Sequence, residues 1–544
     1  MASQTESGPN NLQAEMAKAF KLQNLRDLLG VFILALVVRC IGFGWGLPNA
    51  GRWGSYHPDE STRQIVGAVV SVLRDGLNPH FFNYPSLCVY ATSVIFTVMQ
   101  VLGLTDQTVV PQYPWPLVHD IIVAGRVFSV LCGALTAVCV WGMAREVGLR
   151  RGAILSGVLV ALCPGLVQHS HFATVDVPAT FFVAACLWAT LRAMNYPAQT
   201  KWWIWSAILA GLAAGTKYNA GLVIIAPLVA LVVAQKGEAK PAKWLIPASI
   251  GLAALAFFVT TPYSLLSFSE FWGDADPKKE SGFAFELLVH PRLGSGDIFE
   301  GTGLGWIYHL TFNLPFVLTW PLLIAGLGGI VWAAKDRRQW PLLAFALIYF
   351  LIIGGSNVRF MRYTFLLVPP LMVWAGITAS RLPKPMIWAG ILGLFALLGT
   401  GNVLNPMTDT DMRDRAVRSS GVSTVGLASL PWFGTPPYQP ENFNAMPQYP
   451  HPVQVSVHKI GEPLPANLPD VFVMSEFDYR EQLRLHPDGD VAKFINTLNQ
   501  RYAKSFKYRP QHLLPGRDFA PHDYIYTHPE VLFWQSPNKA PNSP

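Results

Sequence analysis

Long apolar runs, separated by short polar segments, fill most of the chain between residues 28 and 402. A helix that crosses a bilayer needs about 20 mostly apolar residues. By this measure the pattern predicts eleven transmembrane helices, near residues 28–47, 119–144, 152–171, 177–194, 203–216, 219–234, 243–262, 312–333, 341–355, 364–381 and 386–402. The first 27 residues are polar, so we expect the first apolar run to be an uncleaved membrane anchor.

A further apolar run at 85–104 is long enough to cross the bilayer, and the basic residues decide how it is interpreted. Basic residues before the first span place the N-terminus in the cytoplasm, because cytoplasmic loops carry the excess of Lys and Arg. With eleven spans, the later basic clusters face the cytoplasm too; they lie at 145–151, 192–201, 236–243, 335–338 and 381–384. A crossing by 85–104 would move all of these clusters outside. We therefore expect this run to lie along, or dip into, the outer interface.

The composition agrees with a polytopic membrane protein. Of the 544 residues, 51% are hydrophobic and only 13% are charged. Soluble domains carry about 25% charged residues. The net charge of +7 is explained by the basic residues that orient membrane helices, so it does not indicate nucleic-acid binding. All six cysteines lie in apolar runs, which argues against a disulfide framework.

The chain is predicted to have three regions: a cytoplasmic segment 1–27, a transmembrane domain 28–402 whose outer loop is 48–118, and a C-terminal domain 403–544 outside the cytoplasm. The C-terminal region is richer in Pro, Asn, Asp and Tyr than the rest. The fold class expected is an all-α polytopic membrane protein of about 11 transmembrane helices with interfacial helices, followed by a small mixed α/β domain.

The mixed character of the C-terminal region is read from three segments. Val453–Ile460 and Asp470–Met474 have strand-like patterns, and Val491–Tyr502 has the spacing of an amphipathic helix. The region has no nucleotide-binding glycine loop, and the chain shows no internal repeat.

Acidic residues on the outer side indicate an extracytoplasmic active site. Asp59 and Glu60 follow Pro58 just outside the first span, and the apolar stripe of 61–75 predicts a surface helix that has both acids in its first turn. There the helix dipole favours ionised carboxylates, and capping is the alternative explanation. A second acid, Asp176, lies between two apolar runs on the same side, where it could also be an N-cap.

Basic residues at outer positions need an explanation, because outer loops usually lack them. They are Arg126, Lys217, Arg359 and Arg362. Contacts with lipid headgroups are one explanation. The other is a pocket for a phosphate or pyrophosphate, since the planar guanidinium of Arg binds phosphate oxygens in pairs. Arg39, inside the first span, either extends to the interface or joins this pocket.

Histidines offer a weaker signal for a metal site. His169 and His171 are two residues apart, and His57 and His80 lie in the outer loop. Zinc is conceivable, but no HExxH or comparable ligand spacing supports it.

The order of short motifs resembles the GT-C superfamily of integral-membrane glycosyltransferases, in particular protein O-mannosyltransferases and the aminoarabinose transferases that modify lipid A. The motifs are His-Pro-Asp-Glu at 57–60, Asn-Tyr-Pro at 83–85, Gly-Arg-Val-Phe-Ser at 125–129, Phe-Ala-Thr-Val-Asp at 172–176, Thr-Lys-Tyr at 216–218 and Arg-Phe-Met-Arg-Tyr at 359–363. The resemblance covers about residues 28–400 and leaves the C-terminal region unassigned. Some relatives carry Glu-Lys-Pro in place of Asn-Tyr-Pro, so a role for that acid or lysine does not transfer.

The resemblance implies a polyprenyl-phosphate-linked sugar as the donor. The expected catalytic acids are Asp59, Glu60 and Asp176. The residues expected at the donor phosphate are Arg359, Arg362, Lys217 and Arg126. Those expected to contact substrate are His57, Tyr84, Tyr218, Asn219, His171 and Tyr363.

The implied reaction is a single inverting displacement in which Asp59 is the general base and cations stabilise the leaving lipid phosphate. The acids could also assist through a divalent cation, although no tight site is expected. The acceptor is a protein, lipid or glycan outside the plasma (inner) membrane, and membrane lipids surround the helices. A transporter or flippase of lipid-linked sugars is the alternative; such proteins often have inverted repeats and broken helices, and the sequence indicates neither. A non-enzymatic scaffold would leave the outer acids and arginines unexplained.

Overall fold

The computed structural model describes residues 9–49, 51–52, 54–61, 64–105, 115–149, 151–276, 279–420, 422–438 and 453–536. Parts of the predicted segment 1–27, of the outer loop 48–118 and of the C-terminal region lie outside these ranges, as does Arg150 of one basic cluster.

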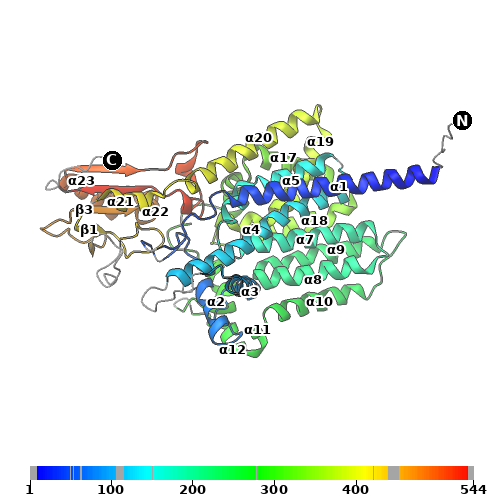
Figure 1. Cartoon of the computed structure of the whole chain (residues 1–544), viewed down its shortest axis with the longest axis horizontal. Coiled ribbons are helices and arrows are strands. Elements are labelled where there is room, and N and C mark those ends of the chain that lie inside the picture. The colour runs from blue at the N-terminus through cyan, green and yellow to red at the C-terminus, as the bar shows by residue number, and fades with distance from the viewer. Residues whose placement is uncertain are drawn as a thin grey trace.

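A bundle of long helices forms the larger part of the molecule, with its helices side by side in Figure 1. They are α1 (Pro9–Cys40), α4 (Trp115–Glu146), α5 (Arg151–Ala161), α6 (Pro164–His169), α7 (Asp176–Asn195), α8 (Thr200–Thr216), α9 (Ile225–Ala234), α10 (Leu245–Thr260), α17 (Trp320–Ala333), α18 (Trp340–Gly354), α19 (Val368–Arg381) and α20 (Pro385–Leu404). Short 3-10 turns, Tyr218–Ile224 and Met361–Leu367, lead into α9 and α19. The shared core between these helices is almost entirely apolar.

Each predicted transmembrane segment contains helical structure, although the helix of the first ends at Cys40 and the third, 152–171, is divided between α5 and α6. By length and composition, however, only four helices of the described chain are apolar enough to cross a bilayer, or five if one bent pair counts as a single span. The mostly helical, membrane-type fold is thus as expected, whereas the number of eleven spans stays a prediction.

The bent pair corrects the expectation of a continuous span at 312–333. Helical segments Gly305–Leu318 and Trp320–Ala333 meet at 117°. Pro321, in the first turn of α17, has no backbone N–H to continue the preceding helix. The carbonyl of Val317, four residues earlier, accepts instead from the Cys163 thiol at 3.2 Å. The expectation that the chain has no broken helix was therefore wrong.

Helix α3 (Leu87–Val101) contains the ambiguous apolar run. Figure 1 shows it end-on, while α4, α7 and α8 run across the view. Its axis therefore crosses the bundle direction, which agrees with a helix that lies along the interface. It packs against α2 (Ile65–Arg74) and the first half of α4 in a small apolar cluster of its own.

The C-terminal region forms a five-stranded sheet in the order β2-β1-β3-β5-β4. The strands are β1 (Thr424–Leu427), β2 (Gln454–Val457), β3 (Val471–Ser475), β4 (Lys504–Tyr508) and β5 (Val531–Gln535), and the helices are α21 (Met412–Ser420), α22 (Glu476–Leu485) and α23 (Asp490–Arg501). β1 is parallel to β2 and β3, while β5 is antiparallel to β3 and β4. The two predicted strand segments and the predicted amphipathic helix correspond to β2, β3 and α23.

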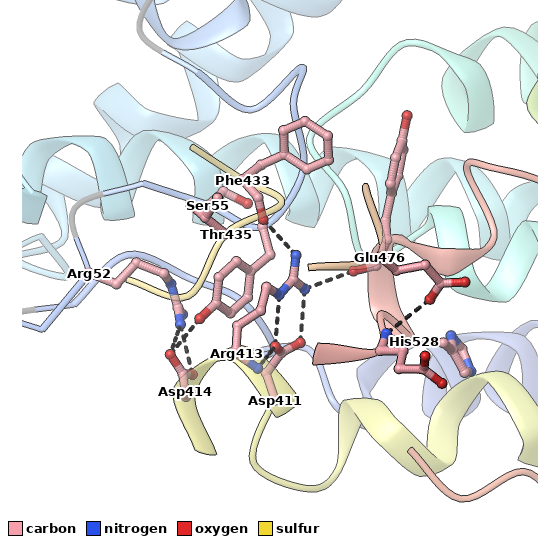
Figure 2. Close-up of polar contacts among 12 residues, drawn as sticks. Arg52, Ser55, Asp411, Arg413, Asp414, Phe433, Thr435, Glu476 and His528 are labelled. Carbon is pink, nitrogen blue, oxygen red and sulfur yellow. Dashed lines mark hydrogen bonds and ion pairs between the residues drawn. The ribbon is translucent and has the colours of Figure 1, made fainter. Parts of the chain in front are cut away.

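The sheet and the N-terminal end of α1 lie at opposite ends of the molecule (Figure 1). The outer loop reaches the sheet domain, where Arg52 Nη1 donates to both carboxylate oxygens of Asp414, at 2.7 and 2.8 Å. The Tyr56 hydroxyl donates to the same carboxylate at 2.5 Å, and the Arg413 guanidinium lies over the Tyr56 ring at 3.6 Å. Figure 2 shows this junction. It fixes the C-terminal domain against the loop that carries Asp59.

Candidate active site

Arg362 occupies the centre of a buried group of acids at the end of the bundle that faces the sheet domain. It lies in the 3-10 turn before α19, and only 8% of its side chain is exposed. Its guanidinium is 3.8 Å from Asp59, 3.8 Å from Asp176 and 3.6 Å from Asp523. Three segments far apart in the sequence thus present carboxylates to one cation.

Asp59 sits in a turn and not in the expected helix. Helix α2 begins only at Ile65, and the described residues just before it, 57–61 and Gln64, form turns and bends. The Asp59 carboxylate is therefore not in the first turn of α2. Burial raises the pKa of Asp59, and the charge of Arg362 opposes this rise. The expectation that a helix dipole favours the ionised form was wrong. Within the described chain, Asp59 Oδ2 accepts no hydrogen bond.

Asp176 and Lys217 form a close ion pair. Asp176 is the first residue of α7, and its Oδ1 is 2.6 Å from Lys217 Nζ. Lys217 has extended backbone between α8 and the following 3-10 turn. Its ammonium also lies over the Tyr363 ring, 4.4 Å from the centroid. Asp176 does not cap α7, since Val175 is the N-cap residue and no side chain bonds there.

Glu60 and Arg126 are bound to each other and fully buried. The Arg126 guanidinium donates from Nε and Nη2 to the two Glu60 oxygens at 2.9 and 2.8 Å. Glu60 also accepts from the Ala173 backbone N–H and the Ser55 hydroxyl. Arg126 Nη1 donates to the carbonyl oxygens of Phe43 and Trp45. These contacts use both oxygens of the acid and three nitrogens of the base.

The other predicted substrate and phosphate residues divide into two sets. Near the acids, the His57 ring packs on Phe172 at 4.4 Å, and burial lowers its pKa, so that the ring is neutral. Burial and the charge of Asp59 raise the pKa of Tyr84, which therefore stays protonated. Asn219 directs a buried Oδ1 that accepts no hydrogen bond within the described chain.

The second set makes contacts elsewhere. Arg359 donates to Thr302 Oγ1 and the Gly303 carbonyl, both at 2.7 Å. The His171 ring nitrogens face the carbonyl oxygens of Val167 and Ile41. The Tyr218 hydroxyl donates to the Phe82 carbonyl at 2.7 Å. Arg39 is also held inside the bundle, by Ser170 and carbonyl oxygens of α1 and α5.

The acids that were considered as metal ligands are already paired with cations. Asp59 and Asp176 face Arg362, Lys217 binds Asp176, and Glu60 is used by Arg126. Among the residues that the structure describes, no group of three His, Cys, Asp or Glu side chains is placed to hold a metal ion. The donor set present does not fit a divalent cation.

Asp523 is the residue that the sequence interpretation missed. It is fully buried, although it belongs to the C-terminal region. Its neighbour Tyr526 places its ring 5.0 Å from that of His57. The only available signal was the dense run of His, Asp and Tyr at 522–528, which has no counterpart in the motifs of the transmembrane region. Glu286 was also missed; it contacts Asn83 at 3.1 Å and its charge raises the pKa of Tyr84.

A cavity of about 430 Å³ lies between residues 298–312 and the C-terminal domain. Its lining includes Thr302, Tyr308, Arg480, Arg484 and His522. His522 is the sequence neighbour of Asp523, which contacts Arg362.

Comparisons with known proteins agree with this architecture. The family model of dolichyl-phosphate-mannose-protein mannosyltransferases matches residues 106–263. An uncharacterized protein of Aquifex aeolicus (strain VF5) is 24% identical over 271 residues, which are 47% of this chain and 48% of that protein. The chain therefore spans about half the length of the curated relative it matches.

Two solved structures are similar to this chain. The archaeal oligosaccharyltransferase AglB from Archaeoglobus fulgidus, in complex with an inhibitory peptide and a dolichol-phosphate, has a TM-score of 0.51 and 14% identity over 73% of this chain and 57% of that chain. ArnT from Cupriavidus metallidurans in the apo state has a TM-score of 0.49 and 15% identity over 95% of this chain and 98% of that chain. The family match confirms, over residues 106–263, the resemblance to mannosyltransferases that the order of motifs indicates, and AglB shares the fold.

Proposed function

We propose that this protein transfers a sugar from a polyprenyl-phosphate donor to a hydroxyl group of an acceptor outside the cytoplasm. The observation that carries the proposal is the placement of Arg362 between Asp59 and Asp176, with Lys217 on the second acid. A buried carboxylate with a free oxygen and two cations a few ångströms away are what such a transfer requires.

In the proposed reaction, Asp59 accepts the proton of the acceptor hydroxyl while the hydroxyl oxygen attacks the anomeric carbon. The bond from that carbon to the phosphate oxygen breaks, and polyprenyl phosphate leaves with the electron pair. Lys217 and Arg362 stabilise the negative charge that grows on the phosphate. One displacement of this kind inverts the anomeric configuration, so a product of retained configuration would contradict it.

The raised pKa makes Asp59 a stronger base than a solvent-exposed aspartate. If all groups were ionised, the three acids Asp59, Asp176 and Asp523 would outnumber the cations Arg362 and Lys217 by one. When Asp59 takes up the acceptor proton, the summed charge of these five side chains becomes zero. The negative charge that Asp59 loses appears on the leaving phosphate, which Lys217 and Arg362 are proposed to stabilise.

The donor class is supported by the family description and by the AglB structure, whose ligand is a dolichol-phosphate. The proposed orientation puts this centre and the C-terminal domain outside the plasma (inner) membrane, since the N-terminal end of α1 lies at the opposite end of the molecule. We propose that the cavity between 298–312 and the C-terminal domain receives the acceptor.

Glu60 and Arg126 are proposed to hold the loop of Asp59 against α4 and not to meet the substrate, because their polar atoms are used by each other and by neighbouring backbone. This pair thus acts on the reaction through the position of Asp59.

The test is mass spectrometry of products from the full chain in lipid nanodiscs, offered a panel of undecaprenyl-phosphate sugars with an envelope extract as the acceptor source. The wild-type chain should release undecaprenyl phosphate from one donor, and Asp59→Asn should not. The matched control is Asp75→Asn, an exposed acid at the end of α2. Equal release by wild type and Asp59→Asn would refute the role of Asp59.

A transporter of lipid-linked sugars is the second candidate, and the 117° break between α16 (Leu314–Leu318) and α17 favours it. The same panel separates the two functions. A transporter would move a fluorescent lipid-linked sugar between leaflets and leave its glycosidic bond intact.

A further inference from the structure

We propose that Asp523, from the C-terminal domain, is a positioning residue of the catalytic centre, which acts by holding Arg362. The inference rests on the proposed function and gives the C-terminal domain a part in the reaction. The C-terminal domain would then contribute a residue to the catalytic centre, in addition to any binding of the acceptor or of the cell envelope.

The contacts of Asp523 are made to the chain at Arg362 itself. Asp523 Oδ1 accepts the backbone N–H of Met361 and Oδ2 accepts that of Arg362, each at 3.0 Å. Oδ2 is also 3.6 Å from Arg362 Nη1. One carboxylate therefore fixes both the main chain and the charged end of Arg362. Hydrogen bonds to a buried charged group are stronger than those between neutral groups.

The transmembrane helices hold the segment around Asp523 in place. Gln168, on α6, donates to the Tyr524 carbonyl and to Thr527 Oγ1, both at 2.7 Å. Asn402, on α20, donates to the Tyr524 hydroxyl at 2.7 Å. Contacts with α6 and α20, in addition to the rest of the C-terminal domain, therefore fix the position of Asp523.

Arg362 needs such a support because three acids compete for it. Without Asp523, the guanidinium would be drawn to the side of Asp59 and Asp176, which lie 3.8 Å away. Arg362 Nη1 donates no hydrogen bond within the described part of the chain and faces Asp523 Oδ2 at 3.6 Å. Asp523 keeps this nitrogen at a fixed place beside the acids. The Tyr526 side chain, three residues on, also contacts Arg362.

A merely structural role for Asp523 would be to attach the C-terminal domain. The two roles predict different effects of an Asp523 substitution. If Asp523 positions Arg362, the substitution changes ligand binding only when Arg362 is present. If Asp523 only attaches the domain, the substitution changes stability whichever residue is at position 362. A double-mutant cycle with Arg362 therefore distinguishes them.

The experiment measures the Kd of undecaprenyl phosphate for the full chain in nanodiscs, together with the unfolding temperature. Asp523→Asn should weaken binding about tenfold in the wild-type background and by less than twofold in an Arg362→Gln background. Asp518→Asn is the matched control, since Asp518 lies on the same segment with its side chain 60% exposed. This control should leave the Kd unchanged.

A Kd of Asp523→Asn within twofold of the wild-type value overturns the inference, and so does an equal weakening in both backgrounds. If Asp523→Asn fails to fold, Tyr526→Phe decides the question. It keeps the buried ring, and it should weaken binding about threefold in the wild-type background only; equal effects in both backgrounds overturn the inference. Failure of the proposed function looks different: the wild-type chain itself would then bind no undecaprenyl phosphate, or would bind it and release none from any donor.

Discussion

Arg362 Nη2 lies 3.8 Å from Oδ2 of Asp59, an oxygen that accepts no hydrogen bond within the described chain. The cation is near enough to favour the carboxylate form but does not cover the oxygen. A general base needs both properties: it must be ionised before the reaction, and it must have an oxygen that can take the proton.

Asp59→Asn is expected to abolish transfer without loss of stability. Removal of a general base typically costs a factor of about 10²–10⁴ in rate. Burial raises the pKa of Asp59, so the folded state favours the protonated acid; this stabilisation is present below the unfolded pKa of 3.8 and is lost as pH rises through the folded pKa. At neutral pH a neutral amide should therefore give an equal or higher Tm. Scanning fluorimetry of both proteins at pH 7 checks this, and a large drop in Tm would contradict it.

Lys217→Met is expected to lower kcat about 10²-fold, because it removes a cation from the leaving phosphate. It should also move the acid limb of the pH–rate profile to higher pH, since the charge of Lys217 lowers the pKa of Asp59. The measurement is kcat/KM from pH 4 to 8 for the variant and for Lys236→Met, an exposed lysine that follows α9. An unmoved acid limb would show that Asp59 is not the group that titrates.

The sequence predicted the helices, and it singled out the two acids, from local information. An apolar run identifies its own helix, and Asp59 and Asp176 each stand out as charges beside apolar segments. The break at Thr319 was missed, although Pro321 is visible, because prolines are tolerated within membrane helices when a neighbour satisfies the freed carbonyl. Here Cys163, the N-cap residue of α6, does so from 154 residues earlier in the chain.

The partners of the charged residues were not predictable. Arg126 and Arg362 look alike in the sequence, each within a short motif at an outer position. Arg126 is neutralised by Glu60, which was itself expected to be catalytic, while Arg362 meets three acids from distant segments. Asp523 could not be assigned because its contact with Arg362 spans 161 residues and passes between two domains.

Arg126→Met is expected to destabilise the fold by about 3–5 kcal/mol, because it leaves the Glu60 carboxylate buried without its ion pair. The double variant Arg126→Met with Glu60→Gln should recover part of this loss. Unfolding temperature and folded yield in detergent measure the effect. If Glu60→Gln instead kept full stability and lost all activity, Glu60 would have a direct catalytic role.

Cysteine labelling tests the proposed orientation. Cys40 is the exposed native cysteine, and the other five are buried. The Cys40→Ala variant therefore has no exposed cysteine that would react with the label. Asp75→Cys should react with a membrane-impermeant maleimide on intact cells, because it lies in the predicted outer loop. Lys236→Cys should react only after permeabilisation. The reverse pattern would place the acids around Arg362 in the cytoplasm.

The cavity beside His522 offers a way to separate the acceptor from the donor. Thr302 is part of its lining and is partly exposed, so Thr302→Cys in the Cys40→Ala background can be modified with a bulky maleimide. The adduct should abolish transfer to the envelope acceptor, because about 430 Å³ is too little space for both the adduct and a sugar. Binding of undecaprenyl phosphate should stay within twofold of its unmodified value, since the proposed phosphate residues lie outside this lining. Unmodified Thr302→Cys serves as the control, because it separates the blocked cavity from the loss of the hydrogen bond to Arg359. Equal loss of donor binding and transfer would mean that the cavity belongs to the donor and that the acceptor approaches from another side.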